Sequence, residues 1–259
     1  MREHITSRGN ARIKLAASLG KTLLCRKTGK FLVEGPRFIR DLVHRGFPAD
    51  YILLSDSATG TCVAAAEEAE RTGIEVLEVT ASLFTEVSAT EHSQGVTAVC
   101  SIPLFSPEMV FSGGSVLALD GVGDPGNAGT AIRSAAAFGC SGVLFLKGSA
   151  FPWNPKVTRA SAGLNTAIPI LEVGALAEMK RSFEDYRFLE ASAEGQDIAF
   201  MAGSSPVCIV IGSEASGIKE ETRRCIDGSV SIPMTPEVES LNAGVSASIL
   251  LYSLFRRKL

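Results

Sequence analysis

The first hundred positions alternate between strand-length apolar runs and amphipathic stretches of helical period. Short apolar runs predict strands at 31–35, 51–54 and 74–79. Apolar positions spaced by three or four predict helices over 36–45 and 61–72. An amphipathic basic segment comes before them. The pattern predicts a small α/β domain over residues 1–100.

The second half contains apolar runs without polar alternation, at 116–119, 143–146 and 207–211. Such runs are typical of strands covered on both faces, as in a parallel sheet flanked by helices. They predict a doubly wound α/β domain over 115–259, with a helix over 128–138. Residues 101–114 combine prolines and glycines with little periodicity, so we expect a surface linker there.

The last helix is predicted to begin near Ser240. One stripe of this helix, apolar except for its serine, consists of Leu241, Val245, Ser248, Ile249, Tyr252 and Phe255. A stripe of this kind usually faces the core. This one is wider than the edge of a small sheet would cover, so it is also a candidate dimer surface.

Composition indicates an ordinary globular protein. The 259 residues, 46% of them hydrophobic, allow one large or two ordinary domains. No apolar run suits a signal peptide or a membrane span. Six cysteines without a C-x-x-C pair and three histidines suggest neither a zinc site nor a disulfide framework. We therefore expect a cytoplasmic protein with reduced thiols and no metal.

The net charge of −3 argues against a nucleic-acid binder until the charges are located. Residues 1–30 carry eight Lys or Arg against one Glu, a net charge of +7, and the remainder carries −10. A concentrated basic face suits phosphate binding. A solvated helical face explains the same pattern equally well. The candidate phosphate contacts are Arg8, Arg12, Lys14, Lys21, Arg26 and Lys27.

Three motifs follow or include predicted strands of the second half: DPGNAGTAIR at 124–133, IGSEASG at 211–217 and IPMTPEVESLN at 232–242. Ligands of α/β sheets bind at the carboxyl ends of strands. The first motif overlaps a G-x-G-x-x-G string beginning at Gly121, which permits a dinucleotide site. Against that reading, Pro125 lacks an N–H for phosphate, and Lys147 follows the next strand instead of an acidic residue.

Several side chains in these motifs have both a chemical and a structural interpretation. Arg133 lies in an alanine-rich helix and is costly to bury without an anionic partner. That partner is either an RNA phosphate or a carboxylate, for instance Glu214. Ser240 is a good N-cap, and Asn242 offers its amide within the first turn of the last helix.

In this order, the three motifs closely resemble the signature motifs of the SpoU (TrmH-like) branch of the SPOUT RNA methyltransferases. The resemblance implies a parallel sheet whose C-terminal chain forms a deep trefoil knot, and a homodimer through the knotted domain. It also implies methyl transfer from S-adenosylmethionine to a ribose 2′-hydroxyl of RNA, ribosomal more than transfer RNA. Residues 1–100 are similar to the ribosomal-protein-like RNA-binding domain of many members.

Matching residue by residue, the resemblance implies two overlapping sets. The cofactor-binding set is Gly212, Glu214, Gly217, Ile232, Met234, Leu241 and Asn242. The catalytic set is Asn127, Arg133, Glu214, Ser240 and Asn242. Arg159, in a recurrent family segment at 159–163, joins the candidate RNA contacts. Pro236 stands where many members have glycine, which leaves the shape of that loop open.

No histidine follows residue 101, so an imidazole base is excluded from the second half. Arg133 is the family's suspected base, but a guanidinium rarely deprotonates, so we expect it to orient a phosphate and stabilise the developing alkoxide. Three alternatives stay open: an antibiotic-resistance rRNA methyltransferase of the same family, a non-catalytic RNA-binding protein and, more remotely, an NADP-dependent Rossmann oxidoreductase.

Overall fold

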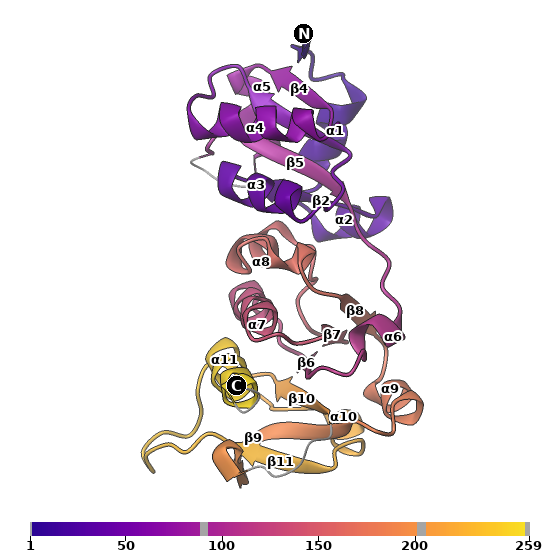
Figure 1. Cartoon of the computed structure of the whole chain (residues 1–259), viewed down its shortest axis with the longest axis vertical. Coiled ribbons are helices and arrows are strands. Elements are labelled where there is room, and N and C mark those ends of the chain that lie inside the picture. The colour runs from indigo at the N-terminus through magenta and orange to yellow at the C-terminus, as the bar shows by residue number, and fades with distance from the viewer. Residues whose placement is uncertain (1, 89–92, 201–205, 257–259) are drawn as a thin grey trace. The chain divides into compact units, whose positions relative to one another are not determined.

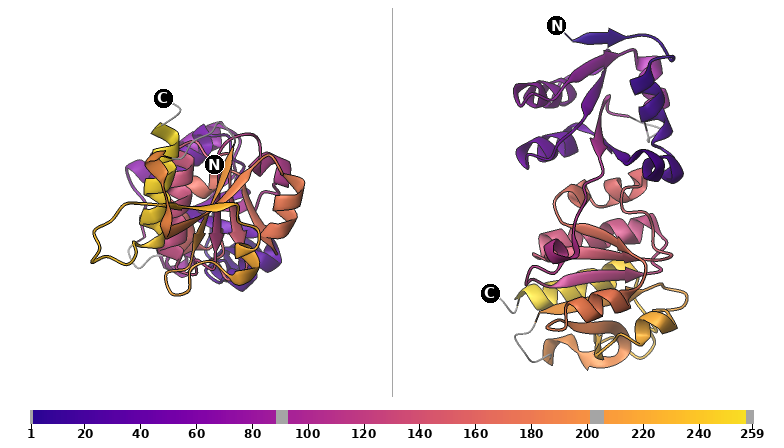
Figure 2. Two further views of the ribbon diagram at one scale, coloured as in Figure 1. Left: turned by 90° about the horizontal axis from the view of Figure 1, so that it is seen from below. Right: turned by 90° about the vertical axis from the view of Figure 1, so that its right-hand side faces the viewer.

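The computed structural model describes residues 2–88, 93–200 and 206–256. The chain forms two compact units, and neither unit is a single stretch of sequence (Figures 1 and 2). The first unit comprises Met1–Pro103 and Trp153–Thr166, and the second comprises Leu104–Pro152 and Ala167–Leu259. Each unit is built around its own β-sheet.

The first unit has a five-stranded mixed sheet in the order β1-β4-β3-β5-β2. Its strands are β1 (Glu3–Ile5), β2 (Lys30–Glu34), β3 (Tyr51–Ser55), β4 (Val76–Val79) and β5 (Val96–Ser101). Strand β5 runs antiparallel to β2 and β3, whereas β1, β3 and β4 are parallel. The three predicted strands are confirmed, and β1 and β5 were not expected.

The helices of the first unit pack around its sheet. They are α1 (Ala11–Ser18), α2 (Thr22–Thr28), α3 (Pro36–His44), α4 (Thr61–Arg71) and α5 (Ala81–Val87). Helix α3 packs beside α4, and α1 contacts α5 (Figure 1). The two predicted helices match α3 and α4 to within one residue at each end. The predicted small α/β domain is therefore present.

Residues 153–166 also pack with the first unit, although they lie inside the range 115–259 predicted for the second domain. They contain α8 (Pro155–Ala160) and the short 3-10 helix η1 (Leu164–Thr166). The Trp153 ring lies 4.7 Å from that of Phe31, and Asn154 Nδ2 donates to Thr22 Oγ1 at 2.8 Å. Trp153 and Val157 are buried. Apolar cover for these two side chains explains why this segment belongs to the first unit.

The second unit has a six-stranded sheet in the order β11-β9-β10-β6-β7-β8, and every neighbouring pair is parallel. Its strands are β6 (Val116–Asp120), β7 (Gly142–Leu146), β8 (Ile170–Val173), β9 (Arg187–Asp197), β10 (Val207–Gly212) and β11 (Gly228–Ser231). The predicted parallel sheet is confirmed. Its central strands β6, β7 and β10 read as continuous apolar runs because helices cover both faces.

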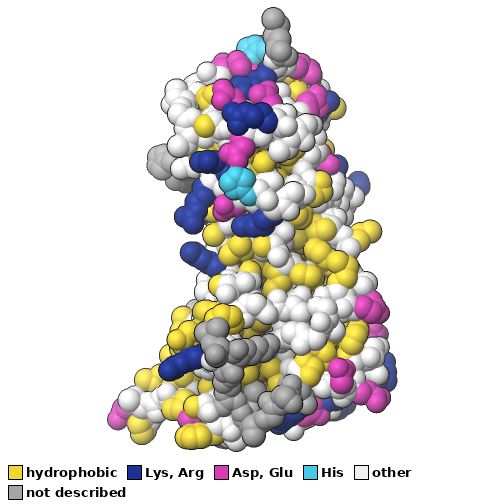
Figure 3. All heavy atoms as spheres, viewed as in Figure 1, with side chains coloured by type: hydrophobic (Ala, Val, Ile, Leu, Met, Phe, Trp, Pro, Cys, Tyr) yellow, Lys and Arg dark blue, Asp and Glu magenta, His cyan; other side chains and the backbone are white. Residues whose placement is uncertain are grey.

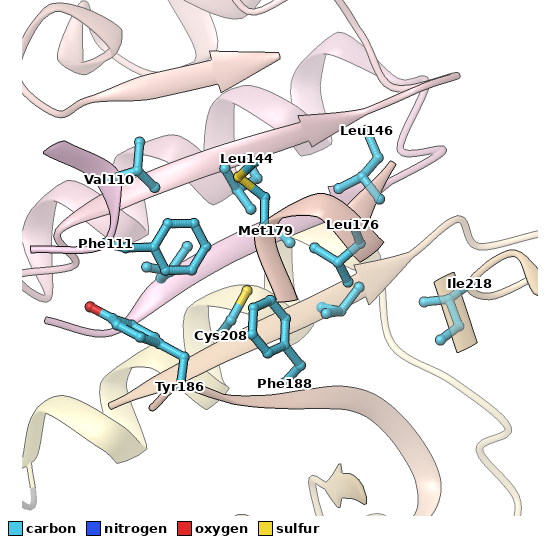
Figure 4. Close-up of a cluster of buried hydrophobic side chains, with 13 residues drawn as sticks. Val110, Phe111, Leu144, Leu146, Leu176, Met179, Tyr186, Phe188, Cys208 and Ile218 are labelled. Atoms are coloured by element: carbon cyan, nitrogen blue, oxygen red, sulfur yellow. The ribbon is translucent and has the colours of Figure 1, made fainter. Parts of the chain in front are cut away.

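One face of this sheet carries α6 (Pro107–Val110), α9 (Leu176–Ser182) and α10 (Glu220–Arg223). Figure 4 shows the core they form, with Phe111, Tyr186 and Phe188 close together. The Phe111 ring lies 4.9 Å from that of Tyr186. Val110 and Phe111 are buried. The predicted surface linker over 101–114 is therefore wrong for 107–111, because those apolar side chains complete a core.

The other face carries α7 (Pro125–Ala137) and α11 (Ala243–Arg256), which pack closely together (Figure 1). Helix α11 buries Ala247, Leu250, Leu251 and Leu254. The predicted stripe lies on the opposite, solvent-exposed face of α11. Its residues Val245, Ile249 and Tyr252 are 43%, 36% and 48% exposed. Both faces of α11 are apolar, so the spacing alone did not identify the buried one.

Candidate active site

The site lies where β6 and β10 end side by side. Gly212 at the end of β10 pairs with Asp120 at the end of β6. From β6 the chain continues to β7 and β8 on one side, whereas β9 and β11 lie beyond β10 on the other. Such a switch in strand order leaves a crevice at the carboxyl ends. The loops that carry the first two motifs therefore meet here.

The first motif opens α7. Asp124 is the N-cap, and its Oδ1 accepts a hydrogen bond from the backbone N–H of Asn127 at 2.8 Å. Pro125 occupies the first helical turn, where a missing N–H costs little. The cap fixes the half-buried Asn127 in the first turn of the helix. The predicted start of this helix at 128 is thus three residues late.

The second motif folds back on itself. Ser213 N donates to Gly217 O at 3.0 Å, and Gly217 N donates to Ser213 O at 2.9 Å. Gly217 has a φ of +65°, in the region that glycine adopts without strain. A Cβ on Gly212 would lie 2.2 Å from the carbonyl carbon of Gly217. Only glycine at 212 permits this closed loop.

An ion pair between the buried Asp120 and the partly exposed Lys219 holds the end of that loop. Asp120, whose side chain has no exposed surface, accepts from Lys219 N at 2.8 Å and from Lys219 Nζ at 3.0 Å. The Lys219 ammonium also donates to the carbonyl of Lys147. Lys219 therefore ties the loop to the carboxyl ends of β6 and β7.

Glu214 joins all three motifs. Its Oε1 accepts from Asn127 Nδ2 at 2.9 Å, from Asn242 Nδ2 at 2.9 Å and from the N–H of Ala243 at 3.1 Å. Asn242 Nδ2 also donates to Asn127 Oδ1 at 2.7 Å. We call Asn127, Glu214 and Asn242 the motif network. Three of the five predicted catalytic residues are thus hydrogen-bonded together.

Asn242 also begins α11. Its Oδ1 accepts from Gly244 N at 3.0 Å and from Val245 N at 3.2 Å, so Asn242 is the N-cap. The predicted N-cap role of Ser240 is wrong, because the helix starts later, at Ala243. A Cβ on Gly244 would lie 3.1 Å from the carbonyl oxygen of Asn127. The small residue therefore lets α11 approach α7 closely.

A pocket of about 210 Å³ opens beside the motif network. Its lining consists of Ala191, Ser192, Ala193, Ile211, Gly212, Ser213, Glu214, Gly217, Val230, Ile232, Met234, Glu239, Ser240, Leu241, Ala243, Ser246 and Leu250. Six of the seven predicted cofactor-binding residues are in this lining. The seventh, Asn242, contacts the pocket residue Glu214 instead.

The contribution of β9, which lines the pocket with residues 191–193, was not predicted. These positions are small and partly polar, so they gave no apolar run. Ser246 and Leu250 of α11 were also missed. The apolar residues Ala247, Leu250 and Leu254 are spaced by three and four positions, and this helical spacing would have indicated the buried face of α11.

Arg133 lies on α7 with its side chain exposed, so the expected cost of burying it does not arise. The alternative ion pair between Arg133 and Glu214 is wrong, because Asn127 and Asn242 occupy the Glu214 oxygen instead. Within 2–88, 93–200 and 206–256, Arg133 forms no ion pair. Its guanidinium is therefore available to a ligand.

Among the described residues, four of the eight cations at positions 1–30 form ion pairs with carboxylates: Arg2, Arg8, Arg12 and Lys30. Arg8 pairs with Glu86, and Arg12 pairs with Glu75 at 2.8 Å. Residues 1–103 carry as many acidic as basic side chains, and Figure 3 shows Lys and Arg side chains lying among Asp and Glu on the face in view. The acidic residues of positions 31–103 therefore balance the charge of residues 1–30, and a basic face formed by the cations that have no carboxylate partner stays a prediction. The exposed candidates are Arg8, Lys14, Lys21, Arg26, Lys27 and Arg159.

Candidate metal sites and membrane-spanning helices are both absent from the part of the chain that the structure describes. No group of three or more His, Cys, Asp or Glu side chains is placed to hold a metal ion in that part of the chain. None of the helices described is both long and apolar enough to cross a membrane.

Comparison with known proteins identifies the family of this chain. The model of the SpoU rRNA methylase family matches residues 114–252. The chain belongs to the SpoU rRNA methylase family. A second model, described as an MRM3-like substrate binding domain, matches residues 10–98 of this SpoU family member. The dinucleotide interpretation of the Gly121 string, and with it the oxidoreductase alternative, is therefore wrong.

Curated relatives of this SpoU family member cover most of its length. The 23S rRNA (guanosine-2'-O-)-methyltransferase RlmB of Xanthomonas axonopodis pv. citri (strain 306) is 34% identical over 74% of this chain and 82% of its own. The 23S rRNA (guanosine(2553)-2'-O)-methyltransferase RlmP of Bacillus subtilis (strain 168) is 30% identical over 88% of this chain and 89% of its own.

Solved structures agree in fold over nearly the whole chain. The SpoU methyltransferase AviRb from Streptomyces viridochromogenes, in complex with the cofactor AdoMet, has a TM-score of 0.84 and 26% identity, covering 96% of this chain and 98% of its own. An AdoMet-bound rRNA methyltransferase from Sinorhizobium meliloti has a TM-score of 0.85 and 25% identity, covering 99% and 98%.

Proposed function

We propose that this protein transfers a methyl group from S-adenosylmethionine to a ribose 2′-hydroxyl of ribosomal RNA. The observation that carries the proposal is the pocket at the carboxyl end of β10, beside the motif network through which residues of all three motifs meet. The relatives' printed names as rRNA 2'-O-methyltransferases support the same reaction.

The pocket residues suit S-adenosylmethionine. Ile232, Met234 and Leu241 offer apolar surface for the adenine, and the carboxylates of Glu214 and Glu239 suit a cation. When bound, S-adenosylmethionine supplies an electrophilic methyl group on a sulfonium. No metal has a role in this proposal.

In the reaction the ribose oxygen bonds to the methyl carbon, the electron pair of the carbon–sulfur bond stays on sulfur, and the 2′-hydroxyl loses its proton. We propose that Arg133 binds an RNA phosphate. Its planar guanidinium would orient the ribose and stabilise the developing alkoxide. Proton removal falls to the phosphate or to water, because the chain has no histidine after residue 101. Asn127, Glu214 and Asn242 hold the loops in register, and Ser240 lies at the rim of the pocket.

The first unit is proposed to bind the RNA. The match of residues 10–98 to a substrate binding domain supports this role. Lys14, Lys21 and Lys27 are exposed and form no ion pair within the described residues, so they are the best phosphate contacts of the original set. Arg26 and Arg159 have other contacts inside the chain.

We further infer a homodimer built on the exposed apolar face of α11. Val245, Ile249 and Tyr252 lie in line on it, and Tyr252 packs on Phe138 with ring centroids 5.5 Å apart. A cytoplasmic location and a C-terminal trefoil knot belong to the same proposal. The return of α11 from the sheet edge at β11 to α7 is compatible with a knot.

The test is to map 2′-O-methylation on total RNA from cells with and without the gene, and to restore the missing mark with purified protein and S-adenosylmethionine. A site that is lost and restored supports the proposal. RNA binding without any methyl transfer would favour the non-catalytic alternative. A mark whose loss changes only sensitivity to a ribosome-targeting drug would favour the resistance alternative.

A further inference from the structure

The lining of the pocket has an unusual charge balance. Among the residues that the structure describes, its charged side chains are Glu214 and Glu239, and no Lys, Arg or His side chain lines it. The remaining lining is apolar or uncharged. The pocket therefore presents two carboxylates to any ligand, with no cation in its lining to offset them.

The two carboxylates differ in their surroundings. Glu214 Oε1 accepts three hydrogen bonds, all from uncharged N–H groups, which orient the carboxylate without neutralising it. Glu239 is exposed and forms no hydrogen bond or ion pair with any residue that the structure describes. Its charge is free to act on a bound ligand. Glu214 belongs to the motif network, so Glu239 is the side chain whose charge can be changed without dismantling the site.

Resting on the proposed function, we propose that Glu239 makes the pocket select the cationic methyl donor over the neutral product. S-adenosylmethionine carries a sulfonium, whereas S-adenosylhomocysteine does not. The two molecules share adenine, ribose, ammonium and carboxylate, and they differ by one methyl group and one positive charge. A carboxylate that acts on the sulfonium therefore strengthens the binding of the donor and leaves that of the product unchanged.

The expected size of the effect is modest because Glu239 faces solvent. A unit charge several ångströms from an exposed carboxylate changes an affinity by roughly three- to tenfold at low salt. Salt screens such an attraction over a Debye length of about 10 Å at 0.1 M. The preference for the donor should accordingly shrink as salt is added. It also helps turnover, because the attraction ends once the sulfonium has lost its methyl group.

The test is calorimetric titration of the full chain with S-adenosylmethionine, S-adenosylhomocysteine and sinefungin, whose protonated amine carries a positive charge near the position of the sulfonium. Glu239→Gln keeps the size of the side chain and removes its charge. We expect it to weaken the two cationic ligands by roughly three- to tenfold, to leave the product within about twofold, and to abolish the salt dependence of the preference.

Glu237→Gln is the matched control, since Glu237 lies in the same loop but does not line the pocket. It should change neither affinity by more than about twofold, as expected for a screened charge. Equal weakening of donor and product by Glu239→Gln would overturn the proposal, because it would mean that Glu239 contacts a group the two share. Unchanged binding of all three ligands would overturn it too. Failure of the unaltered protein to bind any of the three would instead contradict the proposed function.

Discussion

Arg133 carries the largest share of the proposed chemistry. Arg133→Ala should lower the methylation rate by about two orders of magnitude, the usual cost of one preorganised donor, and should leave cofactor affinity within about tenfold. Because the side chain is exposed and unpaired within the described residues, the melting temperature should change little. Single-turnover methylation and thermal melts check both.

Arg133→Lys should recover little of the rate, because a point charge on a flexible stem replaces the planar fork. Arg181→Ala, an exposed arginine on α9 at the other face of the sheet, is the control and should keep full activity. A large drop in melting temperature with normal turnover per folded molecule would refute the catalytic assignment of Arg133.

Asn242 has two functions that substitutions can separate. Asn242→Ser keeps an oxygen that caps α11 but loses the amide donors to Glu214 and Asn127. Asn242→Ala loses both functions and should cost about 1 kcal/mol more in the free energy of unfolding, the typical value of a cap. Both should lose most activity. Equal stability of the two variants in denaturant titrations would contradict the capping role.

The residues of the motif network could be predicted from the sequence, but their hydrogen-bond partners could not. The motifs themselves identified Asn127, Glu214 and Asn242, and the pocket residues at 212, 232 and 241. Their partners could not be predicted: attraction of opposite charges left Glu214 open as a partner of Arg133, whereas in the structure Glu214 accepts from two neutral amides. Asn127 and Asn242 are 115 residues apart, and no local spacing reports that both donate to the same carboxylate.

At the scale of elements, the pair of Asp120 and Lys219 anchors the second motif. Lys219→Met should destabilise the protein by about 3 kcal/mol, because it leaves a buried carboxylate without its cation. Asp120→Asn should cost less, since an amide oxygen still accepts from the N–H of Lys219. Chemical denaturation measures both. A smaller effect for Lys219→Met than for Asp120→Asn would contradict this account.

Strands and helices whose apolar pattern has a single interpretation could be predicted from the sequence. Elements whose pattern allows two interpretations could not. Strands β6, β7 and β10 are long apolar runs, so their burial followed directly. Helix α11 is apolar on both sides, and the choice between its faces depends on packing against α7, where Gly244 permits the close approach. Strand β9 was missed because small and polar residues follow its first apolar positions.

For the whole molecule, the exposed face of α11 predicts the oligomeric state. Ile249→Asp places a charge in the centre of the proposed interface, so it should convert a dimer into a monomer while the fold is kept. Sedimentation velocity at several concentrations checks this. Val238→Asp, an exposed apolar residue outside α11, is the control and should leave the mass unchanged. A monomeric unaltered protein would refute the dimer.

The RNA-binding role of the first unit is best tested without removing it. Deleting residues 1–100 would strip the cover from Trp153 and Val157, so the remaining chain would not be a clean second unit. Changing Lys14, Lys21 and Lys27 together to Ala should weaken binding to the native RNA and lower the salt slope by about one per lost phosphate contact.

The corresponding change of Arg2, Arg8 and Arg12 is the control, because these side chains are already paired with carboxylates. It should have a smaller effect on RNA affinity. If the variant in which Lys14, Lys21 and Lys27 are changed to Ala keeps its full affinity for RNA at two salt concentrations, the RNA binds elsewhere.

The pocket draws its walls from β9, β10, β11 and α11, and α11 begins only at Ala243. A chain on the ribosome that still lacks α11 therefore has no complete cofactor pocket. Nascent and prematurely terminated chains should not compete for the cellular methyl donor, and cofactor cannot stabilise them by mass action. Binding of the donor would thus act as a late check on biosynthesis, favouring chains in which α11 has docked against α7.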